Sequence, residues 1–119
     1  CSTPMVAVSR NVGRKRIMKM LLTGETINAE KAKEIGLIND YCNQSKLEEE
    51  TLMLAEKIIS KSNKVVKIGK EAFYRQLEMP IEEAYRYTSE IMAENMMLLD
   101  AKEGISAFIE KRKPNWKNK

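Results

Sequence analysis

Apolar side chains recur every three or four positions along most of the 119-residue chain, which is the spacing of an amphipathic α-helix. The expected helices cover residues 13–22, 28–35, 45–60, 80–98 and 100–113, and one more begins at Asn63. Only residues 37–41 form a short apolar stretch that suits a small strand or an extended link. The periodicity therefore predicts a mainly α fold, with about five to six helices and at most one short strand.

Several of these helices have residues at their ends that can satisfy free backbone groups. Asn28 is the expected N-cap of the short second helix, and Gly36 follows its end in the left-handed conformation. A serine and a glutamate at residues 45–48 form a predicted capping box. Asn63 is the expected N-cap of the next helix, and Pro80 fits the first turn of the one after it.

Residues 100–113 combine a helix with a strongly charged end. Asp100 is the expected N-cap, and Glu103 stands where it would close a capping box. Phe108 lies on the apolar stripe, and three cations at residues 111–113 end the helix. The local pattern favours an ordinary terminal helix, because the negative end of the helix dipole attracts cations. An aromatic ring three residues before a cation also suits a ligand that carries a flat base and phosphates.

The wording of this run resembles the C-terminal segment of the enoyl-CoA hydratase/isomerase (crotonase) superfamily, approximately D-x-x-E-G-x-x-A-F-x-E-K-R-x-P. The matching positions are Asp100, Glu103, Gly104, Ala107, Phe108, Glu110, Lys111, Arg112 and Pro114. Residues 22–38 resemble a second family pattern, L-T-G-x-x-I-x-A-x-x-A-x-x-x-G-L-(V/I). The opening residues 1–10 look more like the divergent enoyl-CoA hydratase domain-containing branch than the standard hydratases. The chain is identified by this resemblance as the C-terminal part of a crotonase-superfamily protein.

The resemblance implies a fold and an activity for the longer protein. Residues 1–119 would be a single helical trimerisation region at the C-terminus of a longer α/β chain, which forms a homo-oligomer (a trimer or a dimer of trimers). The longer protein would act on acyl-CoA thioesters, most simply by adding water to a trans-2-enoyl-CoA. The family's oxyanion-hole N–H groups and glutamates would lie upstream of Cys1. No catalytic residue is therefore assigned here, and the 119 residues alone are expected to be inactive.

The resemblance also implies where coenzyme A contacts this chain. In the family, the Phe and the Lys of the A-F-x-E-K-R stretch approach the adenine and the 3′-phosphate of coenzyme A, which is often bound to the neighbouring subunit. Phe108 and Lys111 occupy these two positions. An aromatic face can stack on adenine, and an ammonium group pairs with phosphate as a point charge. Coenzyme A is expected as the carrier part of the substrate, with no tightly bound cofactor.

Other residue types exclude several kinds of site. The chain has no histidine, and its two cysteines are Cys1 and Cys42, so neither a zinc site nor a Ser-His-Asp triad is expected. Free thiols indicate a reducing compartment, which would be the cytoplasm of a bacterium or the mitochondrial matrix of a eukaryote. No apolar run approaches the roughly 20 residues of a membrane span, and no membrane partner is expected.

Two other functions remain as alternatives. The first is a non-catalytic oligomerisation and CoA-binding module of a crotonase homologue that lacks hydratase activity. The second is a helix-turn-helix DNA-binding domain, because Ala32 and Gly36 have the spacing of that motif and the isoelectric point is about 9.1. Its recognition helix would begin near Ser45 with three glutamates at residues 48–50, which DNA phosphates repel. Nucleic acid is therefore not expected as a partner.

Overall fold

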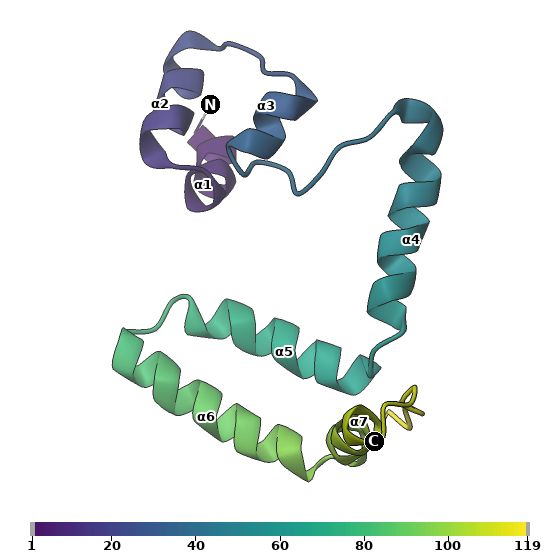
Figure 1. The fold of residues 1–119 in the computed structure, drawn as a ribbon. Helices are drawn as coiled ribbons and strands as arrows, with labels where there is room; N and C mark the ends of the chain where they lie inside the picture. The colour runs from purple at the N-terminus through teal and green to yellow at the C-terminus, as the bar shows by residue number, and fades with distance from the viewer. Residues whose placement is uncertain (1, 119) are drawn as a thin grey trace. The chain divides into compact units, whose positions relative to one another are not determined.

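The computed structural model of the chain describes residues 2–118 (Figure 1). Within that range the chain forms seven α-helices and one 3-10 helix, and no strand. The prediction of a mainly α fold is confirmed, and residues 37–41 form bends and irregular backbone instead of a strand. The chain divides into two compact units, Cys1–Glu50 and Thr51–Lys119. That residues 1–119 form a single functional region of a longer protein stays a prediction.

The first unit contains helices α1 (Ser2–Asn11), α2 (Arg14–Thr23) and α3 (Ala29–Glu34). Its core is formed by three buried apolar residues, with five partly buried ones packed against them: Val12, Ile17 and Ile35, then Val8, Met20, Leu21, Ile27 and Leu37. The Asn28 side chain accepts a hydrogen bond from the Lys31 N–H at 2.8 Å, which confirms the predicted cap. Gly36 has a φ of 77°, which confirms the predicted left-handed residue after that helix.

Helix α4 (Leu47–Ile59) begins differently from the prediction. Asn43 accepts a hydrogen bond from the Ser45 N–H at 3.2 Å and caps the 3-10 helix η1 (Gln44–Lys46), which leads directly into α4. The predicted capping box at residues 45–48 is wrong because Asn43 has already begun the helical turn two residues earlier. The glutamates at 48–50 still lie in the first turn of α4, where the helix dipole favours acids.

The second unit is formed mainly by α5 (Asn63–Gln76), α6 (Ile81–Met97) and α7 (Leu99–Ile109). Helices α5 and α6 lie side by side, and α7 contacts α6 near the end of that helix (Figure 1). The residue that caps α5 is Ser62, whose hydroxyl accepts a hydrogen bond from the Val65 N–H at 3.4 Å. The predicted cap, Asn63, is wrong by one position: Ser62 caps the helix through the Val65 N–H, and Asn63 is the first residue of α5.

The apolar stripes of α4 and α6 are present but exposed. Leu52 and Ile59 of α4 are 56% and 70% exposed, and Ile81 and Tyr85 of α6 are 73% and 70% exposed. No residue of either helix is buried within the described chain. An exposed apolar surface of this size is typical of a surface that contacts another chain or domain. Residues 2–118 contain no helix that combines the length and the hydropathy needed to span a membrane.

Candidate functional site

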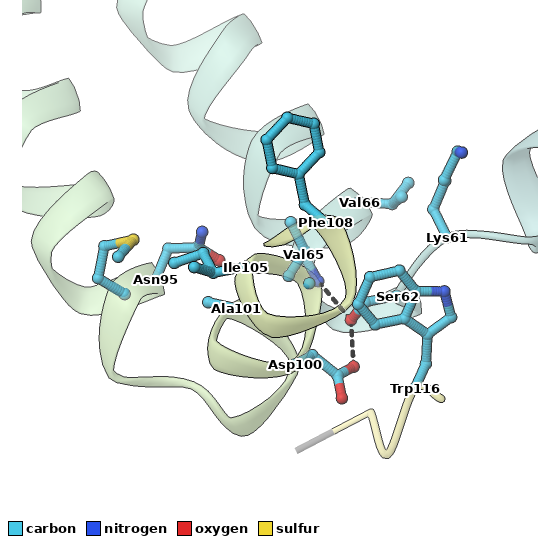
Figure 2. Close-up of a pocket in the computed structure, with 12 residues that line it drawn as sticks. Lys61, Ser62, Val65, Val66, Asn95, Asp100, Ala101, Ile105, Phe108 and Trp116 are labelled. Atoms are coloured by element: carbon cyan, nitrogen blue, oxygen red, sulfur yellow. Dashed lines mark hydrogen bonds between the residues drawn. The ribbon is translucent and has the colours of Figure 1, made fainter. Parts of the chain in front are cut away.

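Asp100 is the most buried charged residue of the second unit, with 1% of its surface exposed. Its carboxylate accepts a hydrogen bond from the Ser62 hydroxyl (Figure 2). It also accepts hydrogen bonds from the Lys117 N–H at 2.6 Å and from the Asn118 N–H at 2.9 Å. Burial raises the pKa of Asp100, but the hydrogen bonds from Ser62 and the two backbone N–H groups outweigh it and hold the pKa below its usual range. Asp100 therefore joins α7, the start of α5 and the C-terminal tail.

The predicted role of Asp100 as the N-cap of α7 is wrong. Leu98 is the N-cap residue and provides no side-chain hydrogen bond. Asp100 already lies within the first turn of α7, because Leu98 adopts the extended backbone that ends one helix and begins the next. Its carboxylate is thereby directed towards the tail and Ser62 (Figure 2).

Glu103 also has a role other than the capping box. Its carboxylate binds the Arg112 guanidinium at two points, Oε1 to Nη1 at 2.6 Å and Oε2 to Nη2 at 2.9 Å. Oε1 also accepts a hydrogen bond from the Asn115 N–H at 2.7 Å. The guanidinium and then this N–H lower the pKa of Glu103 to about 2. Arg112 Nε donates to Glu110 at 2.7 Å, so two carboxylates share this one guanidinium.

Helix α7 ends at Ile109, four residues before the predicted end. The Arg112 N–H binds the Ala107 carbonyl at 3.0 Å, and the Lys111 N–H binds the Phe108 carbonyl at 3.3 Å. This is the hydrogen-bond pattern of a Schellman motif, in which the first residue after the C-cap adopts the left-handed conformation. Lys111 is that residue, with a φ of 53°. Only the last cation of residues 111–113 is thus outside this helix-terminating motif.

The two residues predicted to contact coenzyme A lie at this end of α7. Phe108 is 86% exposed and borders a groove (Figure 2). Lys111 is also exposed, and within residues 2–118 no carboxylate forms an ion pair with it. Among the described residues, the site therefore presents an exposed aromatic ring and an ammonium group without an ion-pair partner, three positions apart in the sequence. Arg112, by contrast, is occupied by Glu103 and Glu110.

The groove next to Phe108 has a volume of about 550 Å³. Residues from α5, α6, α7 and the tail line it, among them Val65, Val66, Met96, Ala101, Ile105, Phe108 and Trp116. Most of these side chains are apolar. Asn95 also borders the groove, and its buried Oδ1 has no hydrogen-bond partner among the described residues. The groove is suited to an apolar or aromatic group.

Trp116 was not identified from the sequence as part of this site. Its indole N–H donates to the Ser60 carbonyl at 2.7 Å, and its ring lies against Gly104. A Cβ atom at Gly104 would lie 3.3 Å from that ring. The glycine of the D-x-x-E-G pattern was the available signal, since a glycine inside a helix often marks a close approach.

Among the described residues, the cysteine and acidic side chains form no second candidate site. Cys1 lies outside the described residues, and Cys42 is a free, half-buried thiol. Among residues 2–118, no group of three or more His, Cys, Asp or Glu side chains is placed to hold a metal ion. The site at the end of α7 remains the candidate.

Comparison with known proteins identifies the family. The family model described as Enoyl-CoA hydratase/isomerase matches residues 2–119. The chain belongs to this family. Human enoyl-CoA hydratase domain-containing protein 3, mitochondrial, is 47% identical over 98% of this chain. Enoyl-CoA hydratase, mitochondrial, of Pongo abelii is 37% identical over 93% of it. These identities confirm the predicted resemblance to the domain-containing branch of the enoyl-CoA hydratases.

A solved structure agrees with the sequence relatives. The crystal structure of an enoyl-CoA hydratase of Mycobacterium smegmatis matches 98% of this chain with a TM-score of 0.94 and 49% identity. The chain therefore has the fold of the C-terminal helical region of enoyl-CoA hydratases. It spans 38% of the length of the human relative and 45% of the mycobacterial chain. Both the human and the Pongo abelii relatives are named as mitochondrial proteins.

Proposed function

We propose that this chain forms part of a coenzyme A site, with Phe108 stacking on the adenine and Lys111 pairing with the 3′-phosphate. The observation that carries the proposal is the exposed Phe108 ring three positions before Lys111, whose ammonium group no carboxylate of residues 2–118 neutralises. Adenine stacking on an aromatic ring contributes roughly 1–3 kcal/mol. Both chemical parts of the nucleotide end of coenzyme A thus have a matching group.

The proposed activity of the full-length protein is the hydration of a trans-2-enoyl-CoA. Membership of the enoyl-CoA hydratase/isomerase family supports an acyl-CoA thioester as the substrate. The alternative is a crotonase homologue that binds coenzyme A and forms oligomers without hydratase activity. The helix-turn-helix alternative has lost its basis, because the chain belongs to a family of acyl-CoA enzymes and α4 begins with three exposed glutamates.

Steady-state kinetics of the full-length protein separates these possibilities. Hydration of a short trans-2-enoyl-CoA is followed by the loss of the conjugated thioester's absorbance. Phe108→Ala is expected to raise KM about tenfold and Lys111→Met about fivefold, with kcat nearly unchanged. Lys102→Met removes an exposed lysine within α7 and serves as the matched control. Unchanged KM values in both variants would refute the coenzyme A contact, and CoA binding without any turnover would favour the non-catalytic alternative.

We also propose that the exposed faces of α4 and α6 contact neighbouring subunits. Met97, Ile81 and Tyr85 of α6 are each at least 70% exposed, and large exposed apolar side chains are typical of interfaces. The expected assembly is a trimer or a dimer of trimers. Light scattering of the full-length protein tests this: Tyr85→Glu is expected to shift the mass towards the monomer, and a wild-type protein that is monomeric would refute it.

A further inference from the structure

Arg112 and Lys111 are adjacent cations with different surroundings. The Arg112 guanidinium binds Glu103 at 2.6 and 2.9 Å and Glu110 at 2.7 Å. Its Nη1 also lies 3.3 Å from the Lys113 carbonyl. A guanidinium has five N–H groups in a fixed planar fork, and these contacts use all three of its nitrogens. Arg112 therefore has little charge or donor capacity left for a phosphate.

Lys111 adopts a backbone conformation that the chain must hold in place. Its φ of 53° is in the left-handed region, which residues other than glycine and asparagine seldom adopt. The residue after it, Arg112, closes the turn through its backbone N–H bond to the Ala107 carbonyl at 3.0 Å. A contact that fixes the position of Arg112 therefore also fixes the left-handed backbone of Lys111, and with it the direction of the Lys111 side chain.

Glu103 supplies that restraint from within α7. Its two oxygens bind the Arg112 side chain, and Oε1 also binds the Asn115 N–H at 2.7 Å. The chain is thereby attached to α7 on both sides of residues 113–114. With the side chains of Glu103 and Arg112 21% and 39% exposed, this pair is better shielded from water than the Glu71–Arg75 pair of α5, at 61% and 62%.

We propose that Glu103 and Arg112 are positioning residues for the 3′-phosphate contact: their bidentate pair holds the left-handed turn that presents the Lys111 ammonium group. Arg112 is not itself a phosphate ligand. This inference rests on the proposed function, because it concerns the group that would position the cation of that site. Glu103 and Arg112 are the first E and the R of the E-G-x-x-A-F-x-E-K-R stretch. Both would act in phosphate recognition through Lys111.

Two variants distinguish positioning from direct binding. Glu103→Gln keeps an oxygen for the Asn115 N–H but removes the charge that holds Arg112. If Arg112 were a direct ligand, freeing it would leave phosphate binding unchanged or stronger, whereas the positioning role predicts weaker binding. Arg112→Lys keeps the positive charge but loses the planar fork. A direct ion pair would survive that change, whereas positioning would not.

The readout is the ratio of the dissociation constants of dephospho-CoA and CoA, measured by titration calorimetry on the full-length protein. Dephospho-CoA lacks only the 3′-phosphate, so this ratio isolates that contact and does not depend on how much protein is folded. Glu103→Gln and Arg112→Lys are each expected to reduce the ratio about threefold, and Lys111→Met about fivefold. In the Lys111→Met background, Arg112→Lys should have no further effect. Arg75→Lys is the matched control and should keep the wild-type ratio.

The possible failures are distinguishable. A ratio that Lys111→Met leaves unchanged would overturn the proposed phosphate contact and this inference with it. A ratio that falls in Lys111→Met but keeps its wild-type value in both Glu103→Gln and Arg112→Lys would overturn the positioning role alone. A further fall when Arg112→Lys is added to Lys111→Met would show a direct contact by Arg112 and would likewise overturn the inference.

Discussion

The carboxylate of Asp100 accepts a hydrogen bond from the hydroxyl of Ser62, a residue 38 positions earlier in the chain. Ser62 in turn caps α5 through the Val65 N–H, and Asp100 also binds the backbone N–H groups of Lys117 and Asn118. Both side chains are buried, at 2% and 1% exposed. One pair of polar residues therefore joins the start of α5, the first turn of α7 and the C-terminal tail.

Asp100→Asn is expected to release the tail. An Asn side chain presents an NH₂ group to N–H donors, so at least one buried hydrogen bond is lost. Hydrogen exchange of the full-length protein should show the protection of the Lys117 and Asn118 amides falling about tenfold. Asp40→Asn, an exposed site in the first unit, is the control. Equal protection in wild type and Asp100→Asn would contradict the role assigned to Asp100.

Gly104→Val is expected to displace Trp116. A Cβ atom at residue 104 would already lie 3.3 and 3.4 Å from the indole ring, and the two further methyl groups of valine have no room. The ring must then move away from the Ser60 carbonyl that its N–H binds. Trp116 is the only tryptophan of these 119 residues, so it is their only source of tryptophan fluorescence. Its emission should shift to longer wavelength because the displaced ring becomes more exposed to water. Gly69→Ala should leave the emission unchanged, because an added Cβ atom there would meet no other part of the chain within 4 Å apart from its neighbours and its own helix backbone.

The Glu103–Arg112 pair is expected to make stability depend on acid pH. Arg112 and the Asn115 N–H lower the pKa of Glu103 from 4.5 to about 2 in the folded chain. A carboxylate whose pKa is lowered by folding stabilises the protein above its unfolded pKa and loses that contribution as the pH falls. The difference in unfolding free energy between wild type and Glu103→Gln should therefore be constant above pH 4.5 and decline towards pH 2. A difference that stays the same down to pH 2 in urea titrations would contradict this.

Lys111→Gly separates the backbone role of this residue from its charge. Glycine adopts a positive φ without the steric cost that lysine has, so the variant should raise the thermal midpoint of the full-length protein by about 2 °C. The same variant lacks the ammonium group and should bind coenzyme A more weakly. Calorimetric scanning and titration measure the two effects on one sample. A fall in the midpoint would show that the left-handed turn needs the lysine side chain.

The helical pattern could be predicted from the sequence because each helix carries its own spacing and, in part, its own caps. The Asn28 cap and the left-handed Gly36 depend on local hydrogen bonds, and both are confirmed. Two other caps were predicted at the wrong residue: Ser45 was expected where Asn43 is the cap, and Asn63 where Ser62 is the cap. In both cases several neighbouring polar residues can cap, and local spacing does not decide between them.

Asp100, Glu103 and Trp116 have roles that depend on contacts between the tail and residues earlier in the sequence: the tail residues 115–118 bind Asp100 and Glu103, and Trp116 binds Ser60. A capping box and a tail-binding pair use the same residue types at the same spacing, so no local pattern distinguishes them.

The exposure of α4 and α6 could not be predicted for a similar reason. Periodicity predicts an apolar face on a helix but does not reveal what covers that face. The match to the family motif selected Phe108 and Lys111, which are joined just past the end of α7 by the hydrogen bond from the Lys111 N–H to the Phe108 carbonyl. Their contact with coenzyme A stays a prediction.

The contact between Lys111 and the 3′-phosphate is tested most directly by phosphorus NMR of coenzyme A bound to the full-length protein. An adjacent ammonium group favours the doubly charged phosphate and lowers its pKa. The 3′-phosphate resonance of bound coenzyme A should therefore titrate at a lower pH than that of free coenzyme A, and Lys111→Met should abolish the difference. A 3′-phosphate that titrates in the wild-type complex as it does in free coenzyme A would contradict the account.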